Sequence, residues 1–595
     1  MITRGSPYSA LTLALAFILA LAALLVLPGA QGQAGVTIAI IAVTLGLGTW
    51  VSVLWLRQRR QGGDLRVAVE IVKAHYVQAS IQIAVYAYWG WYWRPVYDHV
   101  PLIVAQLLLV YAVDMLLSLT RRRRFVLGFG PFPIVLSTNL FLLFKADWFF
   151  LQFAMIILGV LGKEFIRWKT NGRTTHIFNP SAFALFVFSV GLLLTGTTDF
   201  TWGQEIATTL NRPPNIYLQI FLLGLIVQAL FSVTLITLWS VIALALLNLI
   251  YTAATGVYFF FDSNIPIAVF LGLHLLVTDP ATSPRTNIGK VLFGTSYGIV
   301  VFGLFGILDA VGMPTFYDKL LCVPILNLFV PAFDRVVRIF AGRLAWPTWL
   351  PKGNPAHMTL WIFIFVAMFS TGFVGKEHPG SKAAFWQSAC MDGMRHACGN
   401  LLELQTDNCA LGSAMACREA ALLHSRGAPF PENPLAEGTL FARACDLGDE
   451  NACNHLAAFI VAGGNVVLQR DCTGSGGQSC YILGTVAMVG LRPDRDSGIA
   501  VALWQKACDT GISRACVDLG EAWLFGNDVE AAPARAARVF QTACDGGHLP
   551  GCVNLGLMYL SGRGVPKDEA HGRHLLQQAC TKGQDVACIL LNPQD

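Results

Sequence analysis

KACDTGISRACVDLG, residues 506–520, sets the architecture of the C-terminal third of this chain, because it recurs at a fixed interval. The copies are TACDGGHLPGCVNLG at 542–556 and QACTKGQDVACIL at 578–590, so their cysteine pairs start 36 residues apart. A period of this length is typical of helix–turn–helix solenoids. Each copy is predicted to hold the end of one helix, a turn at Gly511, Gly546 or Gly583, and the start of the next helix.

Fourteen of the fifteen cysteines form C-x7-C pairs. Eight residues of one continuous helix span roughly 12 Å, which is too far for a disulfide, whereas a turn brings the two cysteines into bridging range. Zinc is the alternative, but zinc sites usually have closer spacings such as C-x2-C, and no haem-attachment C-x-x-C-H occurs. The predicted disulfides are Cys390–Cys398, Cys409–Cys417, Cys445–Cys453, Cys472–Cys480, Cys508–Cys516, Cys544–Cys552 and Cys580–Cys588.

Disulfides persist in oxidising compartments, so the repeat region is predicted to lie outside the bacterial cytoplasm. Its sequence resembles the SEL-like repeats, a tetratricopeptide-related family, most clearly in NLGLMYLSGRGVPKDEAHGRHLLQQAC at 554–580. The resemblance implies a scaffold that binds a protein partner, here in the periplasm. We place this disulfide-stapled domain at residues 377–595.

The first 375 residues have the composition of a membrane protein. The whole chain is 55% hydrophobic and only 13% charged, and its net charge of +5 does not suggest nucleic-acid binding. The predicted fold is therefore all-α: a polytopic membrane helix bundle in the lipid bilayer, followed by a soluble α-solenoid. Thirteen apolar segments are long enough to span a bilayer, at 9–28, 36–56, 76–93, 100–119, 128–145, 147–166, 179–197, 215–233, 236–253, 262–278, 291–310, 318–333 and 358–375.

Positive charge orients the bundle. Basic clusters lie at 57–66, 121–124, 163–173 and 335–352, and with thirteen spans all four fall on one side. Lys and Arg mark the cytoplasmic side of a membrane protein. We therefore expect a multi-pass protein of the bacterial inner membrane with a cytoplasmic N-terminus and a periplasmic repeat domain.

Two cytoplasmic loops are richer in polar residues than a connector requires: GKEFIRWKTNGRTTHIFNPSAFALF at 162–186 and HLLVTDPATSPRTNIGK at 274–290. Each has an ordinary explanation, since Asn179-Pro180 suits the start of a helix and Asp279-Pro280 ends one. Together they place hydrogen-bonding groups on one side, near membrane depth, where unwound backbone is tolerated if it is buried or lines a cavity. Such groups can hydrogen-bond a flat heterocycle with polar edges.

GKEF…GRTTHIFNPSAF followed by TDPATSPRTNIGKVLFG resembles the RnfD/NqrB family, membrane subunits of flavin electron-transport complexes. The resemblance covers residues 100–335 and implies two related bundles of five helices with a flavin near these motifs. We assign 1–99 to N-terminal transmembrane helices and 100–376 to the RnfD/NqrB-like domain. By match to the motifs, Asn179 and Asp279 are the polar contacts to a flavin ring. The other motif residues, which shape its pocket, are Phe178, Pro180, Thr278 and Pro280.

The chain departs from that family at the site of covalent flavin attachment. The family joins the phosphate of FMN to the threonine of a Ser-Gly-Ala-Thr sequence in a periplasmic loop. The corresponding loop here is TGTTDFTWGQEIATTLNRPPN at 195–215, in which Thr208 is the only candidate. The cofactor is therefore expected to be riboflavin or FMN held without a covalent bond.

Three functions remain open from the sequence. The first is a membrane electron-transport subunit whose repeat domain docks a periplasmic or membrane partner. No nicotinamide site, iron–sulfur motif or haem ligation is present, so the chain lacks a complete active site and other membrane subunits are implied. The alternatives are a small-solute transporter or channel on the same fold and a membrane-anchored assembly scaffold.

Overall fold

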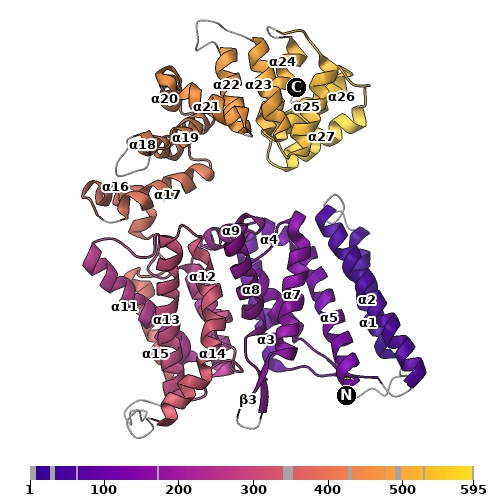
Figure 1. The fold of residues 1–595 in the computed structure, drawn as a ribbon, viewed down its shortest axis with the longest axis vertical. Helices are drawn as coiled ribbons and strands as arrows, with labels where there is room; N and C mark the ends of the chain where they lie inside the picture. Colours follow the sequence, from indigo (N-terminus) through magenta and orange to yellow (C-terminus); the bar gives the residue numbers. More distant parts are fainter. Residues whose placement is uncertain are drawn as a thin grey trace. The chain divides into compact units, whose positions relative to one another are not determined.

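The computed structural model describes residues 9–26, 34–61, 65–170, 173–339, 353–394, 396–425, 432–474, 476–489, 497–526 and 529–591. The chain divides into two compact units, Met1–Lys382 and Ala383–Asp595. Both units are built from helices, as Figure 1 shows. The predicted all-α fold class is confirmed, because the strands in the described part of the chain are four short segments.

The first unit is a bundle of long apolar helices with short connecting elements. Its helices are α1 (Ser9–Ala23), α2 (Ala34–Gln61), α3 (Lys73–Tyr92), α4 (Pro95–Asp98), α5 (Val100–Arg122), α6 (Pro131–Asn139), α7 (Phe149–Phe165), α8 (Pro180–Thr195), α9 (Gly203–Thr209), α10 (Ile216–Phe231), α11 (Thr234–Thr255), α12 (Ile267–Leu275), α13 (Asn287–Ala310), α14 (Asp318–Ile339) and α15 (Asn354–Thr371). Short 3-10 helices cover Leu24–Val26, Ala146–Trp148, Thr198–Phe200, Thr315–Tyr317 and Pro379–Ser381.

The helices of this unit have the length and composition of membrane-spanning helices. Seven helical stretches in the described residues are long and apolar enough to cross a bilayer, and six of them lie in the first unit. The seventh, Glu450–Thr473, lies in the repeat unit, carries Cys453 and Cys472, and is interrupted at Gly463, whose φ is 103°. We therefore treat that stretch as part of the solenoid and the first unit as the membrane part.

Two of the thirteen predicted spans are helical over only half their length. The segments 128–145 and 262–278 contain the nine-residue helices α6 and α12, and each continues as non-helical chain. Both segments still cross the bundle: Phe144 pairs with Thr201 beyond the end of α8, whereas Asp279 lies near His176 before its start. Each predicted span therefore combines a nine-residue helix with non-helical chain.

Buried side chains explain why α6 can end inside the bundle. The Asn139 and Gln106 side chains donate to each other's carbonyl oxygens at 2.7 and 3.0 Å, and Gln152 Nε2 donates to Asn139 Oδ1 at 3.2 Å. Gln152 Oε1 also accepts the backbone N–H of Phe144 at 3.0 Å. Polar groups at membrane depth are tolerated when protein groups satisfy them, so this amide network permits the interruption.

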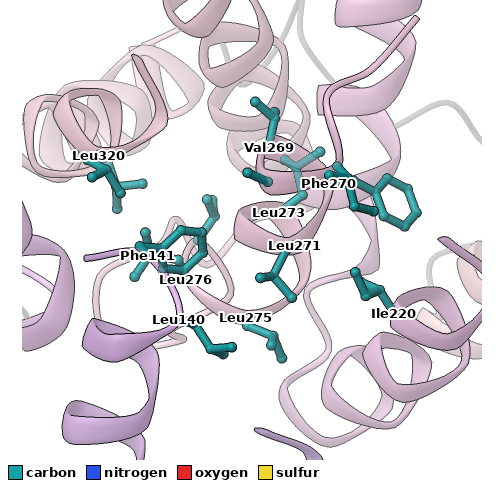
Figure 2. Packing of buried hydrophobic residues seen from close by; sticks show 14 of the residues in the cluster. Leu140, Phe141, Ile220, Val269, Phe270, Leu271, Leu273, Leu275, Leu276 and Leu320 are labelled. Carbon is teal, nitrogen blue, oxygen red and sulfur yellow. The ribbon is translucent and has the colours of Figure 1, made fainter. Parts of the chain in front are cut away.

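The ends of the two short helices meet in an apolar core. Leu140 and Phe141 follow α6, and their side chains pack with Leu275 and Leu276 at the end of α12, as Figure 2 shows. Leu320 of α14 belongs to the same buried cluster. The centre of the bundle is thus filled by apolar side chains.

Strands close one end of the bundle. Strand β1 (Arg66–Val69) pairs in parallel with β2 (Arg124–Leu127), and β3 (Arg167–Thr170) pairs antiparallel with β4 (Arg173–His176). Figure 1 places β3 at the end of the unit away from α9. The chain enters α8 directly after β4, so this hairpin delivers the residues of the first polar motif to that end.

The second unit is a stack of antiparallel helix pairs. Its helices are α16 (Ala383–Met391), α17 (Ala397–Ala410), α18 (Ala414–Ser425), α19 (Pro434–Asp446), α20 (Glu450–Phe459), α21 (Asn465–Thr473), α22 (Gly477–Val489), α23 (Ser497–Asp509), α24 (Ser513–Phe525), α25 (Pro533–Asp545), α26 (Leu549–Ser561), α27 (Glu569–Thr581) and α28 (Asp585–Leu591), with a π-helical turn at Ile460–Gly464. Each helix packs against its neighbour along the chain.

All seven C-x7-C pairs form disulfides, with Cα–Cα distances between 4.5 and 4.8 Å. Each joins the last turn of one helix to the first turn of the next. Gly511 and Gly583 occupy such turns with φ of 93° and 94°, a conformation that favours glycine. The remaining cysteine, Cys322, is buried and free in α14.

Candidate functional site

The FNP motif forms the start of α8. Asn179 is its N-cap: Oδ1 accepts the backbone N–H groups of Ser181 at 3.0 Å and Ala182 at 3.2 Å. Pro180 takes the first helical position, where its missing N–H removes no helical hydrogen bond. Phe178 is half-buried and stacks on Phe183, with ring centroids 5.1 Å apart. The ordinary capping role considered from the sequence is therefore real.

The TDP motif follows the end of α12. Thr278 is buried and its hydroxyl donates to the backbone oxygen of His274 at 2.9 Å. Asp279 is half-buried, and its Oδ1 accepts the N–H of Ala281 at 2.9 Å, which closes a tight turn. Pro280 is exposed within that turn. The motif thus presents a carboxylate at the rim of the bundle.

Direct hydrogen bonds join the two motifs, although about a hundred residues separate them. Asn179 Nδ2 donates to the backbone oxygen of Leu276 at 3.0 Å. His176 Nε2 lies 3.2 Å from Asp279 Oδ2. The structure therefore brings Asn179 and Asp279 to one location, as the sequence predicted for the two loops.

Asn327 of α14 completes this junction. Its Oδ1 accepts the backbone N–H of Asn179 at 3.2 Å, and its Nδ2 donates to the backbone oxygen of Thr282 at 3.1 Å. Asn327 is buried, so both of its amide groups are committed to the protein. One side chain thus fixes the distance between the FNP helix and the TDP loop.

Sequence reasoning missed two members of this site, His176 and Asn327. A signal existed for each: His176 precedes the FNP motif by two residues, and Asn327 is a polar residue inside the apolar run CVPILNLFV. Polar residues in such runs usually bond within the protein. The partner of either residue could not be predicted from the sequence, because those contacts join distant segments.

Asn179 and Asp279 keep hydrogen-bonding groups that the contacts described above do not use, and such groups suit a ring with polar edges. Asn179 keeps one amide hydrogen, since its other groups are used, and the carboxylate of Asp279 retains lone pairs beyond its two contacts. His75, at the start of α3, lies within electrostatic range of Asp279 and Lys163. The junction therefore leaves one amide N–H and carboxylate lone pairs uncommitted at the rim.

Thr208 lies far from this junction. It belongs to α9, beyond the C-terminal end of α8, and the 16 residues of α8 separate its end of the bundle from Asn179. The hydroxyl of Thr208 is exposed and donates to the backbone oxygens of Gln204 and Glu205 at 3.2 and 3.3 Å. Thr208 is thus not part of the same site as the two motifs.

Positive charge gathers at the end of the bundle that holds the motifs. Pairing of β1 with β2 places Arg66 opposite Arg124. Arg121, Arg122 and Arg167 all form ion pairs with Glu164, which joins two further basic segments. The predicted clusters at 57–66, 121–124 and 163–173 therefore meet in space in their described parts.

A polar cluster links three helices of the repeat unit. The Tyr481 hydroxyl of α22 donates to Asp518 Oδ2 of α24 at 2.9 Å, and Arg514 pairs with Asp446 of α19 at 3.5 Å. Burial raises the pKa of Asp518, although its hydrogen bond to Tyr481 and the nearby Arg514 charge oppose that change. The cluster ties α19, α22 and α24 together and leaves part of Arg514 exposed.

A protein-family model matches part of this unit. The Sel1 repeat model matches residues 477–511, 513–548 and 549–584. Cys508–Cys516 joins the first match to the second, and Cys544–Cys552 joins the second to the third. The disulfides therefore staple successive repeats, as the spacing predicted. The comparison with curated proteins found no match.

Solved structures include similar repeat proteins. A Sel1 repeat protein from Oxalobacter formigenes is 20% identical, covers 22% of this chain and 97% of its own, and gives a TM-score of 0.20. The protein c5321, a protective antigen present in uropathogenic Escherichia coli strains that displays an SLR fold, is 14% identical. It covers 51% of this chain and 72% of its own, with a TM-score of 0.22. On the family match, residues 477–584 are Sel1 repeats, which imply protein–protein interaction.

Proposed function

We propose that this chain is a membrane electron-transfer subunit that holds a flavin at the FNP and TDP junction and docks a protein partner through its Sel1 repeats. The observation that carries the proposal is the direct bonding of the two motifs, Asn179 to Leu276 and His176 to Asp279. These motifs are also the residues on which the resemblance to the RnfD/NqrB family depends. A bound flavin would supply the redox chemistry, and the protein would supply binding and orientation.

The chain's own residues have separate roles in this proposal. Asn179 offers an N–H donor to a polar ring edge, while Asp279 offers an acceptor. His176 lies 3.2 Å from Asp279 and orients its carboxylate. Asn327 acts as a positioning residue, because it bonds the backbone on both sides of the junction.

Charge and disulfides support one orientation in the bacterial inner membrane. Basic residues gather at the motif end of the bundle, and such residues favour the cytoplasmic side. The seven disulfides favour an oxidising compartment for the repeats. We infer a cytoplasmic N-terminus and motif end, a periplasmic repeat domain, and further membrane subunits that deliver and accept electrons.

Cofactor analysis of the detergent-purified chain tests the flavin proposal. Flavin absorbance is expected in the wild type, reduced in Asp279→Asn, and unchanged in Asp309→Asn, which alters an exposed aspartate on α13. Asp279→Asn keeps the side-chain shape, so a loss of flavin would reflect the lost carboxylate. Colourless wild-type protein, prepared with riboflavin and FMN supplied during expression, would refute the proposal.

A small-solute transporter is the second candidate, and the interrupted helices α6 and α12 favour it. Broken helices whose ends meet near the midplane are common in transporters with related halves. The apolar packing of Leu140, Phe141 and Leu276 at that point would then have to open. Solute-dependent swelling of liposomes that hold the purified chain would support transport, while unchanged swelling with a flavin-loaded chain favours electron transfer.

A further inference from the structure

A cavity of about 230 Å³ lies at the end of the first unit opposite the motifs. Its walls are three segments: 211–217 between α9 and α10, 262–264 before α12, and 373–381 after α15. The chain that leaves this cavity through α12 reaches the TDP motif at the other end. The cavity is therefore separate from the proposed flavin site.

Hydrogen bonds between its walls hold the cavity in shape. The Tyr217 hydroxyl donates to the backbone oxygen of Ile265 at 2.7 Å, which ties the first wall to the second. Asn264 Nδ2 donates to the backbone oxygen of Phe373 at 3.1 Å, which ties the second wall to the third. Asn248 Nδ2 in turn donates to Asn264 Oδ1 at 2.9 Å. The three walls thus form one preformed site.

Two cations line the cavity without a protein counter-charge of their own. Within the described ranges, neither the Arg212 guanidinium nor the Lys376 ammonium forms an ion pair or side-chain hydrogen bond. The acidic residues of the lining are Asp262 and Glu377, and Glu377 pairs with Lys382 at 3.2 Å. Arg212 and Lys376 carry two positive charges, and the Asp262 carboxylate carries one negative charge. With Glu377 paired to Lys382, the net charge of these three side chains is +1.

His378 is a buried residue of the same lining. Its side chain belongs to a residue only 8% exposed, and its Nδ1 accepts the N–H of Gly380 at 3.1 Å. The neutral ring therefore carries its hydrogen on Nε2, which is buried and has no acceptor among the described residues. Tyr258 holds the ring edge-on, with centroids 4.1 Å apart. Nε2 has almost no accessible surface, so it does not face the interior of the cavity.

We propose that this cavity binds a small oxyanion, a carboxylate or a phosphate, through Arg212 and Lys376. Its volume equals that of about eight water molecules at roughly 30 Å³ each. That is below the roughly 300 to 1,000 Å³ of pockets for drug-sized ligands, so the site takes a small ion or headgroup and not a flavin. The anion comes either from solution or from the headgroup of an anionic phospholipid.

Thermal unfolding of the intact chain in detergent tests the proposal. Sodium succinate and inorganic phosphate are titrated separately against sodium chloride of the same ionic strength, and tryptophan fluorescence reports the melting temperature. A saturable rise with either anion is expected, because a ligand that binds only the folded state stabilises it. The lipid source is tested in phosphatidylcholine nanodiscs with and without phosphatidylglycerol.

Charge-matched variants identify the site. Arg212→Gln/Lys376→Gln should weaken apparent affinity by about tenfold or more, since two charge-assisted hydrogen bonds are lost. The charge-preserving Arg212→Lys/Lys376→Arg should retain most of the affinity, and Arg335→Gln/Arg338→Gln, which removes two exposed cations of α14, should match the wild type. No saturable rise with succinate, phosphate or phosphatidylglycerol would overturn the proposal, as would an equal rise in the first variant.

Discussion

Replacement of Asn179 by leucine should loosen the junction between the two polar motifs. The change removes an N-cap, which costs about 1 kcal/mol. It also leaves the backbone oxygen of Leu276, a residue 1% exposed, without its donor at 3.0 Å, which costs about 1–3 kcal/mol. The expected loss is therefore about 2–4 kcal/mol in the free energy of local opening around α8 and the TDP loop.

Two further variants separate the cap from the bridge. Asn179→Ser keeps a capping oxygen but loses the bond to Leu276, so its loss should be about 1 kcal/mol smaller. Thr286→Val removes the N-cap bond to Gly289 at the start of α13, which is a cap without a bridge. Only the two Asn179 variants should affect the amides of Leu276 and Val277, which both donate to Gly272.

Hydrogen exchange read by mass spectrometry on the detergent-solubilised chain measures these effects. A loss of 2 kcal/mol corresponds to exchange about 30-fold faster for amides that exchange through local opening. Unchanged exchange at 272–282 in Asn179→Leu would show that the bridge does not hold the two motifs together. Equal acceleration in Thr286→Val would assign the effect to general loss of helix stability.

Three other outcomes follow from the structure. Cys508→Ser/Cys516→Ser should destabilise α23 and α24 by about 2–3 kcal/mol, because the unfolded chain regains the entropy that the disulfide loop removes. Amide exchange in α23 and α24 should then be faster. Cys580→Ser/Cys588→Ser should affect mainly α27 and α28. Maleimide should label no thiol in the native chain, one (Cys322) after denaturation without reductant, and all fifteen after reduction; more than one before reduction would contradict the disulfide assignment. Burial lowers the pKa of His378 from 6.5 to about 4, so between those pH values the unfolded chain binds more protons than the folded chain. The free energy of unfolding should therefore fall by about 2 kcal/mol as the pH drops from 6.5 to about 4, after allowance for solvent screening. His378→Phe should remove that part of the pH dependence of the melting temperature.

The repeat unit could be predicted closely from its sequence, because its contacts are local. A cysteine eight residues from its partner with a glycine between them leaves one simple geometry, a helix–turn–helix joined by a disulfide. Cys508, Gly511 and Cys516 contain the whole of that information. The same holds for Asn179 as an N-cap, since its partners are two and three residues away.

The membrane unit was predicted less well, because hydropathy measures only whether a segment is apolar. The segments 128–145 and 262–278 are mostly apolar, so they were predicted as membrane spans. The structure ends the two helices at Asn139 and Leu275, where side chains of other helices bond to them. Gln106 bonds the Asn139 side chain and Gln152 accepts the N–H of Phe144 after α6, while Asn179 donates to the backbone oxygen of Leu276 after α12. Such tertiary contacts, like those of Asn327, leave no periodic pattern in a single sequence.

The polar interior bears on the choice between the candidate functions. A membrane anchor requires only apolar helices, and a buried amide that bonds another buried amide adds little stability over an apolar pair of the same shape. This unit nevertheless buries Gln106, Asn139 and Gln152 around one helix end and Asn327 at the other junction. These groups stabilise two interrupted helices and hold the FNP and TDP motifs together, which an anchor does not need. The features that sequence hydropathy could not detect are therefore those that favour an electron-transfer or transport role over a scaffold. Substitution of Asn327 by leucine separates the two views: an anchor should tolerate it with only a loss of stability, whereas a flavin site should lose bound cofactor at a temperature where the chain remains folded.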